Sequence, residues 1–189
     1  MLELVLKKEI IVNKALSRTF GVLVFILLTA LGAFVRIPLP FTPVPITLQT
    51  FFVLLSGLFL GQSLGALSQL SYICLGVWGL PIFTGAGSGI AYLFGPTGGY
   101  LFGFVLVSFL LGTFTKRNHN ALLPVFVILC MADLILLSCG TIWLKFIFGY
   151  SFKKTLLIGF LPFLPGDLFK ALVAAFLYLK FKSRIKEIF

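Results

Sequence analysis

Six apolar segments run along this chain, and proline, glycine or charged residues separate them. They cover approximately residues 20–35, 47–60, 64–80, 98–114, 121–144 and 155–179. Between residues 37 and 115 there is no Asp, Glu, Lys, Arg or His, a stretch much longer than the ~20 apolar residues of one membrane-spanning helix. The pattern therefore predicts an all-α protein, an integral membrane bundle of six transmembrane helices. The last segment contains LPFLPGD, so we expect it to be broken or to begin near Pro165.

The composition agrees with a membrane protein. Hydrophobic residues make up 60% and charged residues 11% of the 189 residues, a balance that soluble domains do not have. In a soluble protein the formal net charge of +10 would suggest a nucleic-acid partner. Here the basic residues lie mostly at the chain ends and in short breaks between the apolar segments, so we interpret them as orientation signals and contacts with anionic lipid. We expect membrane lipid as a partner and no nucleic acid.

The positions of the basic residues predict the orientation of the bundle. With the N-terminus inside, ten basic residues lie on the inner side and four on the outer side. The inner residues are Lys7, Lys8, Lys14, Arg18, Lys116, Arg117, Lys180, Lys182, Arg184 and Lys186, and the outer residues are Arg36, Lys145, Lys153 and Lys154. Because cytoplasmic loops are enriched in Lys and Arg, we expect both termini to be cytoplasmic. Residues 1–19 would then form a cytoplasmic segment, 20–181 the membrane domain and 182–189 a basic tail.

This orientation places the unusual backbone on the outer face. A proline loop (37–46), a glycine loop (79–99) and the approach to the last helix (160–167) lie outside, whereas GQS (61–63) and TKRNHN (115–120) make short inner connections. Each proline fixes φ and removes a backbone donor, so the proline loop is expected to be an extended, rigid connector. Irregular backbone near a membrane is tolerated where protein buries it or where it lines a cavity. We therefore expect a ligand pocket that opens outward.

Five residues in the two long loops are candidates for a pocket wall and lid. Pro43 and Pro45 would stiffen the proline loop. Gly87 and Gly89 would allow positive φ or close packing in a lid, and Tyr92 would supply an amphipathic contact. The string GAGSG resembles a phosphate-binding loop, but no Lys follows it and no strand precedes it, which argues against a nucleotide site. A purely structural role for the glycine loop remains the alternative.

Charged residues inside apolar segments are the sharper signal, because burying a charge in a membrane is unfavourable by ~2.5–3.5 kcal/mol. Asp167 and Lys170 are three residues apart, so on a helix they share one face and can pair with each other or with a polar ligand. The alternatives are a structural ion pair and a helix N-cap by Asp167. Asp133 has no cation near it in sequence, so we expect it to be protonated or bonded to helical neighbours.

The residue patterns of enzymes are missing from the sequence. The histidine of the chain, His119, lies in the charged inner loop, and the sequence has no HExxH, no Ser–His pairing and no close pair of carboxylates. Cys74, Cys130 and Cys139 lie inside apolar segments without CxxC spacing, so we interpret them as small buried hydrophobic residues. We predict no catalytic residue, no metal and no cofactor. Without a Walker motif the chain cannot drive transport with ATP by itself.

Four strings of residues carry a resemblance to a known family. They are IPLPFTPVPITLQTFFVLLSGLFLG, LGVWGLPIF, GSGIAYLFGPTGGYLFGF and FLPFLPGDLFKALVAA, and they occur in this order between residues 37 and 175. In combination and spacing they resemble the BioY family, the biotin-specific S components of energy-coupling factor (ECF) transporters. The resemblance extends over about residues 20–181.

The resemblance implies a six-helix protein of the prokaryotic cell membrane that binds biotin from outside and takes part in its uptake. It implies as partners an ECF coupling transmembrane subunit and two ATPase subunits. The proline loop would be a preformed pocket wall, and TLQT would begin the second helix with Thr47 and Gln49 facing inward. Asp167, Lys170, Thr47, Gln49 and Tyr92 would then be the substrate-binding residues. A stand-alone biotin facilitator and an S component for another small vitamin remain alternatives, and a membrane enzyme is disfavoured.

One feature departs from the family pattern. S components commonly present Ala-x-x-x-Ala on the first helix for docking the coupling subunit, whereas the matching positions here are Thr29 and Ala33. Ala30 and Gly32 flank them, so the surface is expected to allow close helix contact.

Overall fold

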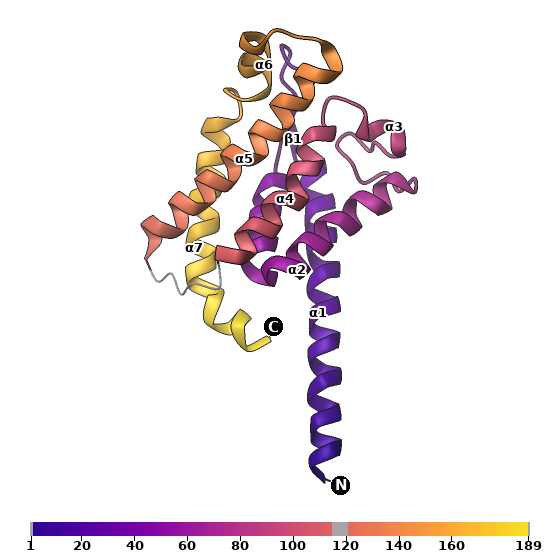
Figure 1. The fold of residues 1–189 in the computed structure, drawn as a ribbon, viewed down its shortest axis with the longest axis vertical. Helices are drawn as coiled ribbons and strands as arrows, with labels where there is room; N and C mark the ends of the chain where they lie inside the picture. Colours follow the sequence, from indigo (N-terminus) through magenta and orange to yellow (C-terminus); the bar gives the residue numbers. More distant parts are fainter. Residues whose placement is uncertain (1, 115–120, 189) are drawn as a thin grey trace.

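The computed structural model describes residues 2–114 and 121–188, with side chains for residues 14–114 and 121–185. The described residues form a helical bundle, which confirms the predicted fold class (Figure 1). Its elements are α1 (Leu2–Phe34), β1 (Arg36–Ile37), β2 (Ile46–Thr47), α2 (Gln49–Val77), α3 (Ile90–Leu93), α4 (Gly98–Phe114), α5 (Leu122–Phe148), α6 (Phe152–Gly159) and α7 (Leu164–Ile188).

Helix α2 consists of two arms that fold back on each other at Gly61. Gly61 has φ 77° and ψ −174°, a conformation open to glycine and strained for other residues. The side chains of Ser56 and Gln69, thirteen positions apart, are hydrogen bonded at 3.2 Å, whereas in a straight helix they would be separated by ~20 Å. The predicted inner connection GQS is therefore a helix reversal, and Figure 1 shows both arms.

Within the described residues, three helical stretches are long and apolar enough to cross a membrane, namely Lys14–Phe34, Gln49–Val77 and Leu122–Phe148, or four if the bent pair α6–α7 counts as one span. Since α2 contains two arms and α4 is a shorter apolar helix, each of the six predicted apolar segments has a helical counterpart among the described residues. The last segment is broken as predicted: α6 and α7 meet at 49°, and α7 begins at Leu164. Helix α1 begins earlier than the predicted segment, at Leu2.

The proline loop forms the tip of a small hairpin. Its ends pair as the antiparallel strands β1 and β2, with Arg36 opposite Thr47 and Ile37 opposite Ile46. The prolines keep the loop extended, and the paired residues at its two ends, which are not prolines, have the N–H groups that strand pairing needs. The hairpin is anchored to α1, because Leu48 N donates to the carbonyls of Gly32 (3.2 Å) and Val35 (3.1 Å).

Close backbone approach and buried polar groups hold the helices together. The Cβ of an alanine at position 112 would lie 2.0 Å from Gln62 N, so α4 packs directly against the turn of α2 through the bare backbone of Gly112. Beside it, the buried Gln69 amide donates to Thr29 of α1 (3.3 Å) and to Ser56 (3.2 Å). Ser56 in turn bonds Ser108 of α4 at 3.1 Å. This network, which the sequence did not reveal, ties α1, α2 and α4 into one unit.

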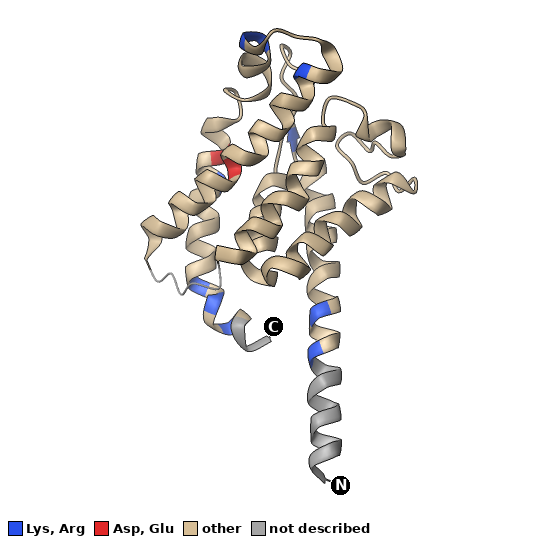
Figure 2. Cartoon of the chain, viewed as in Figure 1, with Lys and Arg blue, Asp and Glu red and all other residues tan. Residues whose placement is uncertain are grey.

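Basic residues gather at the two ends of the bundle. Figure 2 shows one group where α1 enters and α7 leaves, and a smaller group at the opposite end around α6. The acidic residues whose side chains are described, Asp133 and Asp167, lie between them, on α5 and α7. This separation agrees with the predicted charge asymmetry, although His119 and the predicted inner residues Lys116 and Arg117 lie outside the described residues. The side chains of Lys7, Lys8 and Lys186 are likewise outside the described part.

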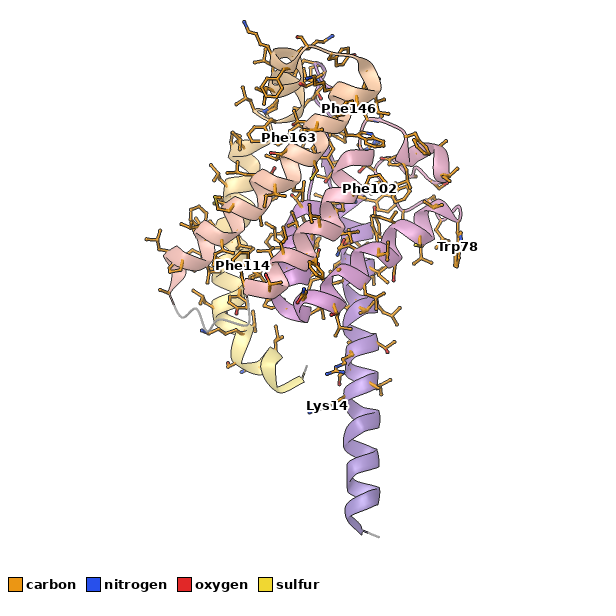
Figure 3. The ribbon with its side chains drawn as sticks, in the orientation of Figure 1. Lys14, Trp78, Phe102, Phe114, Phe146 and Phe163 are labelled. Atoms are coloured by element: carbon orange, nitrogen blue, oxygen red, sulfur yellow. The ribbon has the colours of Figure 1, made fainter. Side chains whose placement is uncertain are left out.

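Two expectations about small residues were wrong. Thr29 and Ala33 are fully buried, because this face of α1 packs on α2 of the same chain, so neither is available to an outside helix. Cys74 is exposed on the second arm of α2 rather than buried, and Cys130 and Cys139 are half-buried. The surface of the bundle instead carries large apolar side chains such as Trp78 and Phe146, which point away from it (Figure 3).

Candidate functional site

The candidate site is a pocket between the proline loop, the glycine loop, the N-terminal parts of α2, α4 and α7, and the middle of α5. All five predicted substrate-binding residues line it. The first and the last of them are more than a hundred positions apart in the sequence, so the fold brings them together. The lining consists of Val44, Pro45, Thr47, Gln49, Thr50, Phe83, Thr84, Tyr92, Thr97, Tyr100, Leu101, Phe104, Leu137, Phe163, Asp167 and Lys170. Their contact with a ligand stays a prediction.

An ion pair between Asp167 and Lys170 forms the polar floor of the pocket. Lys170 Nζ lies 2.7 Å from Asp167 Oδ1, and the two side chains are only 11% and 3% exposed. Thr50 Oγ1 donates to the same carboxylate oxygen at 3.2 Å and accepts from Lys170 Nζ at 2.9 Å. Lys170 also donates to the Thr47 carbonyl at 2.7 Å. These hydrogen bonds connect α7 to the start of α2. The charged pair is therefore already oriented when a polar ligand binds.

This geometry tests the alternative interpretation of Asp167 as a helix N-cap. Asp167 lies inside the first turn of α7, which begins at Leu164, and its carboxylate accepts from Lys170 and Thr50. The N-cap interpretation of Asp167 was therefore wrong. The shared helix face of Asp167 and Lys170 is confirmed by their ion pair.

Gln49 forms the second polar group of the pocket and is fixed in orientation. Its amide nitrogen donates to the Tyr72 hydroxyl at 2.7 Å, and its amide oxygen accepts from Thr84 Oγ1 at 3.0 Å. The Tyr72 hydroxyl in turn donates a hydrogen bond to the carbonyl of Ile82 at 2.9 Å. Gln49 therefore connects α2 to the glycine loop, and its buried position, 4% exposed, agrees with the inward direction expected for it.

Aromatic rings form the wall that the glycine loop contributes. Phe83 is fully buried, stacks on Tyr92 at 4.7 Å and meets Tyr72 edge-on at 5.6 Å. The Tyr92 hydroxyl donates to the carbonyl of Thr84 at 3.1 Å. On the opposite side, Phe163 packs near Tyr100, whose hydroxyl donates to the Gly159 carbonyl at 2.6 Å. The pocket thus combines one charged pair, one amide and four threonines with walls of aromatic and aliphatic side chains, as small-molecule sites generally do.

The predicted lid residues are divided by the structure. Pro45 lines the pocket, whereas Pro43 is exposed on the outer surface of the loop. Gly87 and Gly89 do not line it either. A Cβ at Gly87 would lie 2.3 Å from the Tyr92 ring, so Gly87 makes room for that ring. Gly89 has φ 86° and its N–H donates to the Gly76 carbonyl at 2.8 Å, which anchors the loop on α2.

Sequence reasoning missed several pocket residues. Thr50 directly follows Gln49 in TLQT, so its place in a string that already supplied two selected residues was the signal for it. Tyr100, which directly follows the glycine loop, was not among the predicted residues. For Phe83, Phe104 and Phe163 there was no signal, because 23 phenylalanines are spread along the chain and three-dimensional packing alone distinguishes the few that reach the pocket.

Asp133 also lies closer to the site than the sequence suggested. Asp133 on α5 and Asp167 on α7 line the same small cavity behind the ion pair. The packing of α5 on α7 places both carboxyl groups at this cavity, although they lie far apart in the sequence. The expectation that helical neighbours bond Asp133 is not met at Oδ1, which is buried without a hydrogen-bond partner among the described residues.

The free volume of the pocket is small in this conformation. It is ≈ 40 Å³, whereas pockets that hold small organic ligands measure roughly 300–1,000 Å³. The walls must therefore move apart before a ligand of that size enters.

Comparison with known proteins identifies the family. The BioY family model matches residues 7–187. The chain belongs to the BioY family. It is 39% identical over 161 residues to the biotin transporter BioY of Thermotoga maritima, covering 85% of this chain and 92% of that protein. It is 41% identical over 155 residues to the probable biotin transporter BioY of Pyrococcus horikoshii, covering 81% and 88%.

A solved structure is similar over nearly the whole chain. The crystal structure of the S-component for biotin from an ECF-type ABC transporter matches with a TM-score of 0.83 at 28% identity, and the match covers 90% of this chain and 92% of that one. The resemblance seen in the sequence is thereby confirmed. Since the family consists of transporters, the prediction that this protein is not an enzyme is confirmed as well.

Proposed function

We propose that this BioY protein binds biotin with high affinity and takes it up across the cell membrane as the substrate-specific component of an ECF-type transporter. The observation that carries the proposal is the buried Asp167–Lys170 pair in an aromatic pocket of a BioY-family chain. Its relatives in other prokaryotes are named biotin transporters.

The chemistry of biotin suits the groups in this pocket. The ureido ring has two N–H donors and a carbonyl acceptor, and the side chain ends in a carboxylate. Asp167 can accept from a ureido N–H, and Lys170 can donate to the ureido carbonyl or to the carboxylate. Gln49, Thr47 and the rings of the glycine loop would complete the site, because aromatic faces and edges make favourable contacts with a thioether.

The topology that we propose has six spans with both termini in the cytoplasm. The reversal at Gly61 and the bent pair α6–α7 support six spans, and the gathering of basic residues where α1 enters and α7 leaves supports the orientation. The pocket then opens to the outside. In this proposal residues 20–181 form the membrane domain, flanked by a cytoplasmic segment (1–19) and a basic tail (182–189).

The proposed partners are an ECF coupling transmembrane subunit and two ATPase subunits. The solved structure that this chain resembles belongs to an ECF-type ABC transporter, and the sequence has no Walker motif of its own. Because Thr29 and Ala33 are buried, a coupling helix would have to meet other residues of the bundle. A chain that works alone as a facilitator is the second candidate, and that burial favours it.

Equilibrium binding of labelled biotin to the purified, folded protein tests the proposal. We expect saturable binding that unlabelled biotin displaces and that thiamine and riboflavin do not. Displacement by another vitamin would indicate a different S component, and absence of saturable biotin binding would refute the proposed ligand. Uptake by cells with and without the ATPase subunits then separates the energised component from the facilitator.

A further inference from the structure

Behind the ion pair lies a buried carboxyl group that the proposed binding site does not use. Asp133 on α5 is 5% exposed, and its Oδ1 has no hydrogen-bond partner among the described residues. It lines a cavity of ≈ 60 Å³ between α5 and α7. The other lining residues are Cys130, Leu134, Leu164, Asp167, Leu168 and Ala171.

Asp167 is the wall that this cavity shares with the ligand pocket. It lines both spaces, while its Oδ1 accepts from Lys170 and Thr50 on the ligand side. A change of charge at Asp133 therefore acts directly on the carboxylate of the proposed ligand site, across one cavity and without an intervening helix.

Among the residues whose side chains are described, none supplies a free cation next to Asp133. The ammonium of Lys170 has three N–H groups, and they are directed at the Thr47 carbonyl, Thr50 Oγ1 and Asp167 Oδ1. Within the described part of the chain, the charged groups that act electrostatically on Asp133 are Asp167, which lines the same cavity, and Lys170, both on α7. Helix α6 carries Lys153 and Lys154 on its exposed surface.

Uncharged titratable groups complete the surroundings but supply no positive charge. Cys130, on the same helix, lines the cavity. Tyr100, on α4, donates its hydroxyl proton to the Gly159 carbonyl. An ionised Asp133 would thus be a second buried negative charge next to a single, already committed lysine.

An ionised and unpaired carboxylate is strongly unfavourable in such a place. Water in the cavity could donate to Oδ1 but would not neutralise the charge. A metal cation prefers several oxygen ligands, and the lining offers side-chain oxygens from two residues only, beside leucine, alanine and cysteine. A proton needs no further ligands, so it is the occupant that this lining favours.

We propose that Asp133 is a proton-binding site that controls the ligand pocket through Asp167. With the proton bound, Asp167 keeps Lys170 as its sole partner charge. When the proton leaves, the new carboxylate repels Asp167 and competes for Lys170. The ion pair between Asp167 and Lys170 at the floor of the pocket is then displaced. Ligand affinity then falls as the pH rises through the titration of Asp133.

The protonation state can be measured directly, because the sequence contains two aspartates, Asp133 and Asp167. We would label the protein with carboxyl-13C aspartate and record the carboxyl resonances and infrared bands in membranes at neutral pH. We expect one protonated acid and one carboxylate, with the acid signal missing in Asp133→Asn. Two carboxylates at neutral pH would overturn the proposal, and this readout needs no ligand.

The second arm measures biotin affinity from mildly acidic to alkaline pH and rests on the proposed function. We expect the wild type to lose affinity by about tenfold or more toward alkaline pH. Asp133→Asn, which has the shape of the neutral acid, should stay within about threefold of the wild type's low-pH affinity throughout. Ser138→Ala is the control on the same helix, because its hydroxyl bonds Leu134 of its own helix, and it should follow the wild type.

The outcomes separate the two proposals. Parallel pH profiles for wild type and a folded Asp133→Asn, or loss of binding in that variant at every pH, would overturn the control of the pocket by Asp133. Absence of biotin binding in the wild type at every pH would refute the proposed ligand instead, and the labelling experiment then decides the proton by itself. If Asp133→Asn does not fold, the wild type decides both steps: two carboxylates at neutral pH, or a biotin affinity that stays constant while the acid signal titrates, would overturn the proposal.

Discussion

Neutralising one member of the Asp167–Lys170 pair should weaken both biotin binding and the stability of the fold. The pair is nearly inaccessible to solvent, with a 2.7 Å contact and side chains 11% and 3% exposed. In Lys170→Met, Asp167 keeps only the hydroxyl of Thr50, and in Asp167→Asn the ammonium keeps two neutral acceptors and no opposite charge. Breaking a buried pair from one side is typically unfavourable by ~3–5 kcal/mol. If the bound ligand depends on both groups, the affinity should fall by roughly 10²- to 10³-fold or more.

The double variant Asp167→Asn/Lys170→Met distinguishes a pair that contacts the ligand from a purely structural ion pair. Both charges are removed together, so the penalty for leaving one charge unpaired disappears. Labelled-biotin binding and urea unfolding are measured on the wild type, both single variants and the double variant. If each residue contacts the ligand, the double variant binds no better than the weaker single variant, although its stability recovers. Recovery of near-native affinity would refute the assignment and leave a structural ion pair.

Three further predictions follow from the fold. Membrane-impermeant thiol reagents should label Ala86→Cys from outside and Ser183→Cys only from inside, in a background where the native cysteines are replaced; the reverse pattern would refute the orientation. Replacing Pro43 and Pro45 together with Ala should weaken biotin binding, while the unfolding free energy falls by only ~0.4–1 kcal/mol per proline. Gly112→Ala should lower stability by ~1–3 kcal/mol or more in thermal unfolding, because its Cβ would lie 2.0 Å from Gln62 N.

The glycine prediction has a matched control on the same helix. A Cβ at Gly103 would find its nearest atoms at 3.4 Å, an ordinary contact distance, so Gly103→Ala should leave the melting temperature nearly unchanged. Equal losses in the two variants would indicate a general effect of alanine in α4 rather than close packing at the reversal of α2. For the prolines, unchanged affinity in the double variant would make the loop a mere connector.

The helices could be read from the sequence because the lipid environment imposes long apolar runs, and proline, glycine and charge interrupt them. The reversal at Gly61 and the break before Leu164 fall where such residues occur. The pairing of Asp167 with Lys170 was likewise local, since helical spacing alone puts both on one face.

Contacts between helices could not be predicted in the same way. Which face of an apolar helix turns inward depends on packing against its neighbours, and nearly every face of these helices is hydrophobic. The proximity of Asp133 to Asp167 depends on how α5 lies on α7, and the burial of Thr29 depends on how Gln69 reaches across from α2. The small residues at Thr29 and Ala33 looked like an outer docking surface for the same reason: a small side chain suits any close contact, inside the bundle or outside it.

The wall that must move for a ligand to enter can be inferred from how each wall is anchored. Gly112 and the Gln69 network lock α2 and α4 together, and the glycine loop is held by fully buried Phe83. The tip of the proline loop is different: it is largely exposed, and Val44, directly after it, fills the pocket mouth with only 4% of its surface exposed. From Thr47 onward the chain is again fixed, by Lys170. We expect this stiff, proline-rich segment to move as one body, which would displace Val44 without disordering the loop, so that little ordering entropy is lost when the pocket closes. Alanine at the prolines removes that stiffness, which is why it should affect biotin affinity before it affects the stability of the fold.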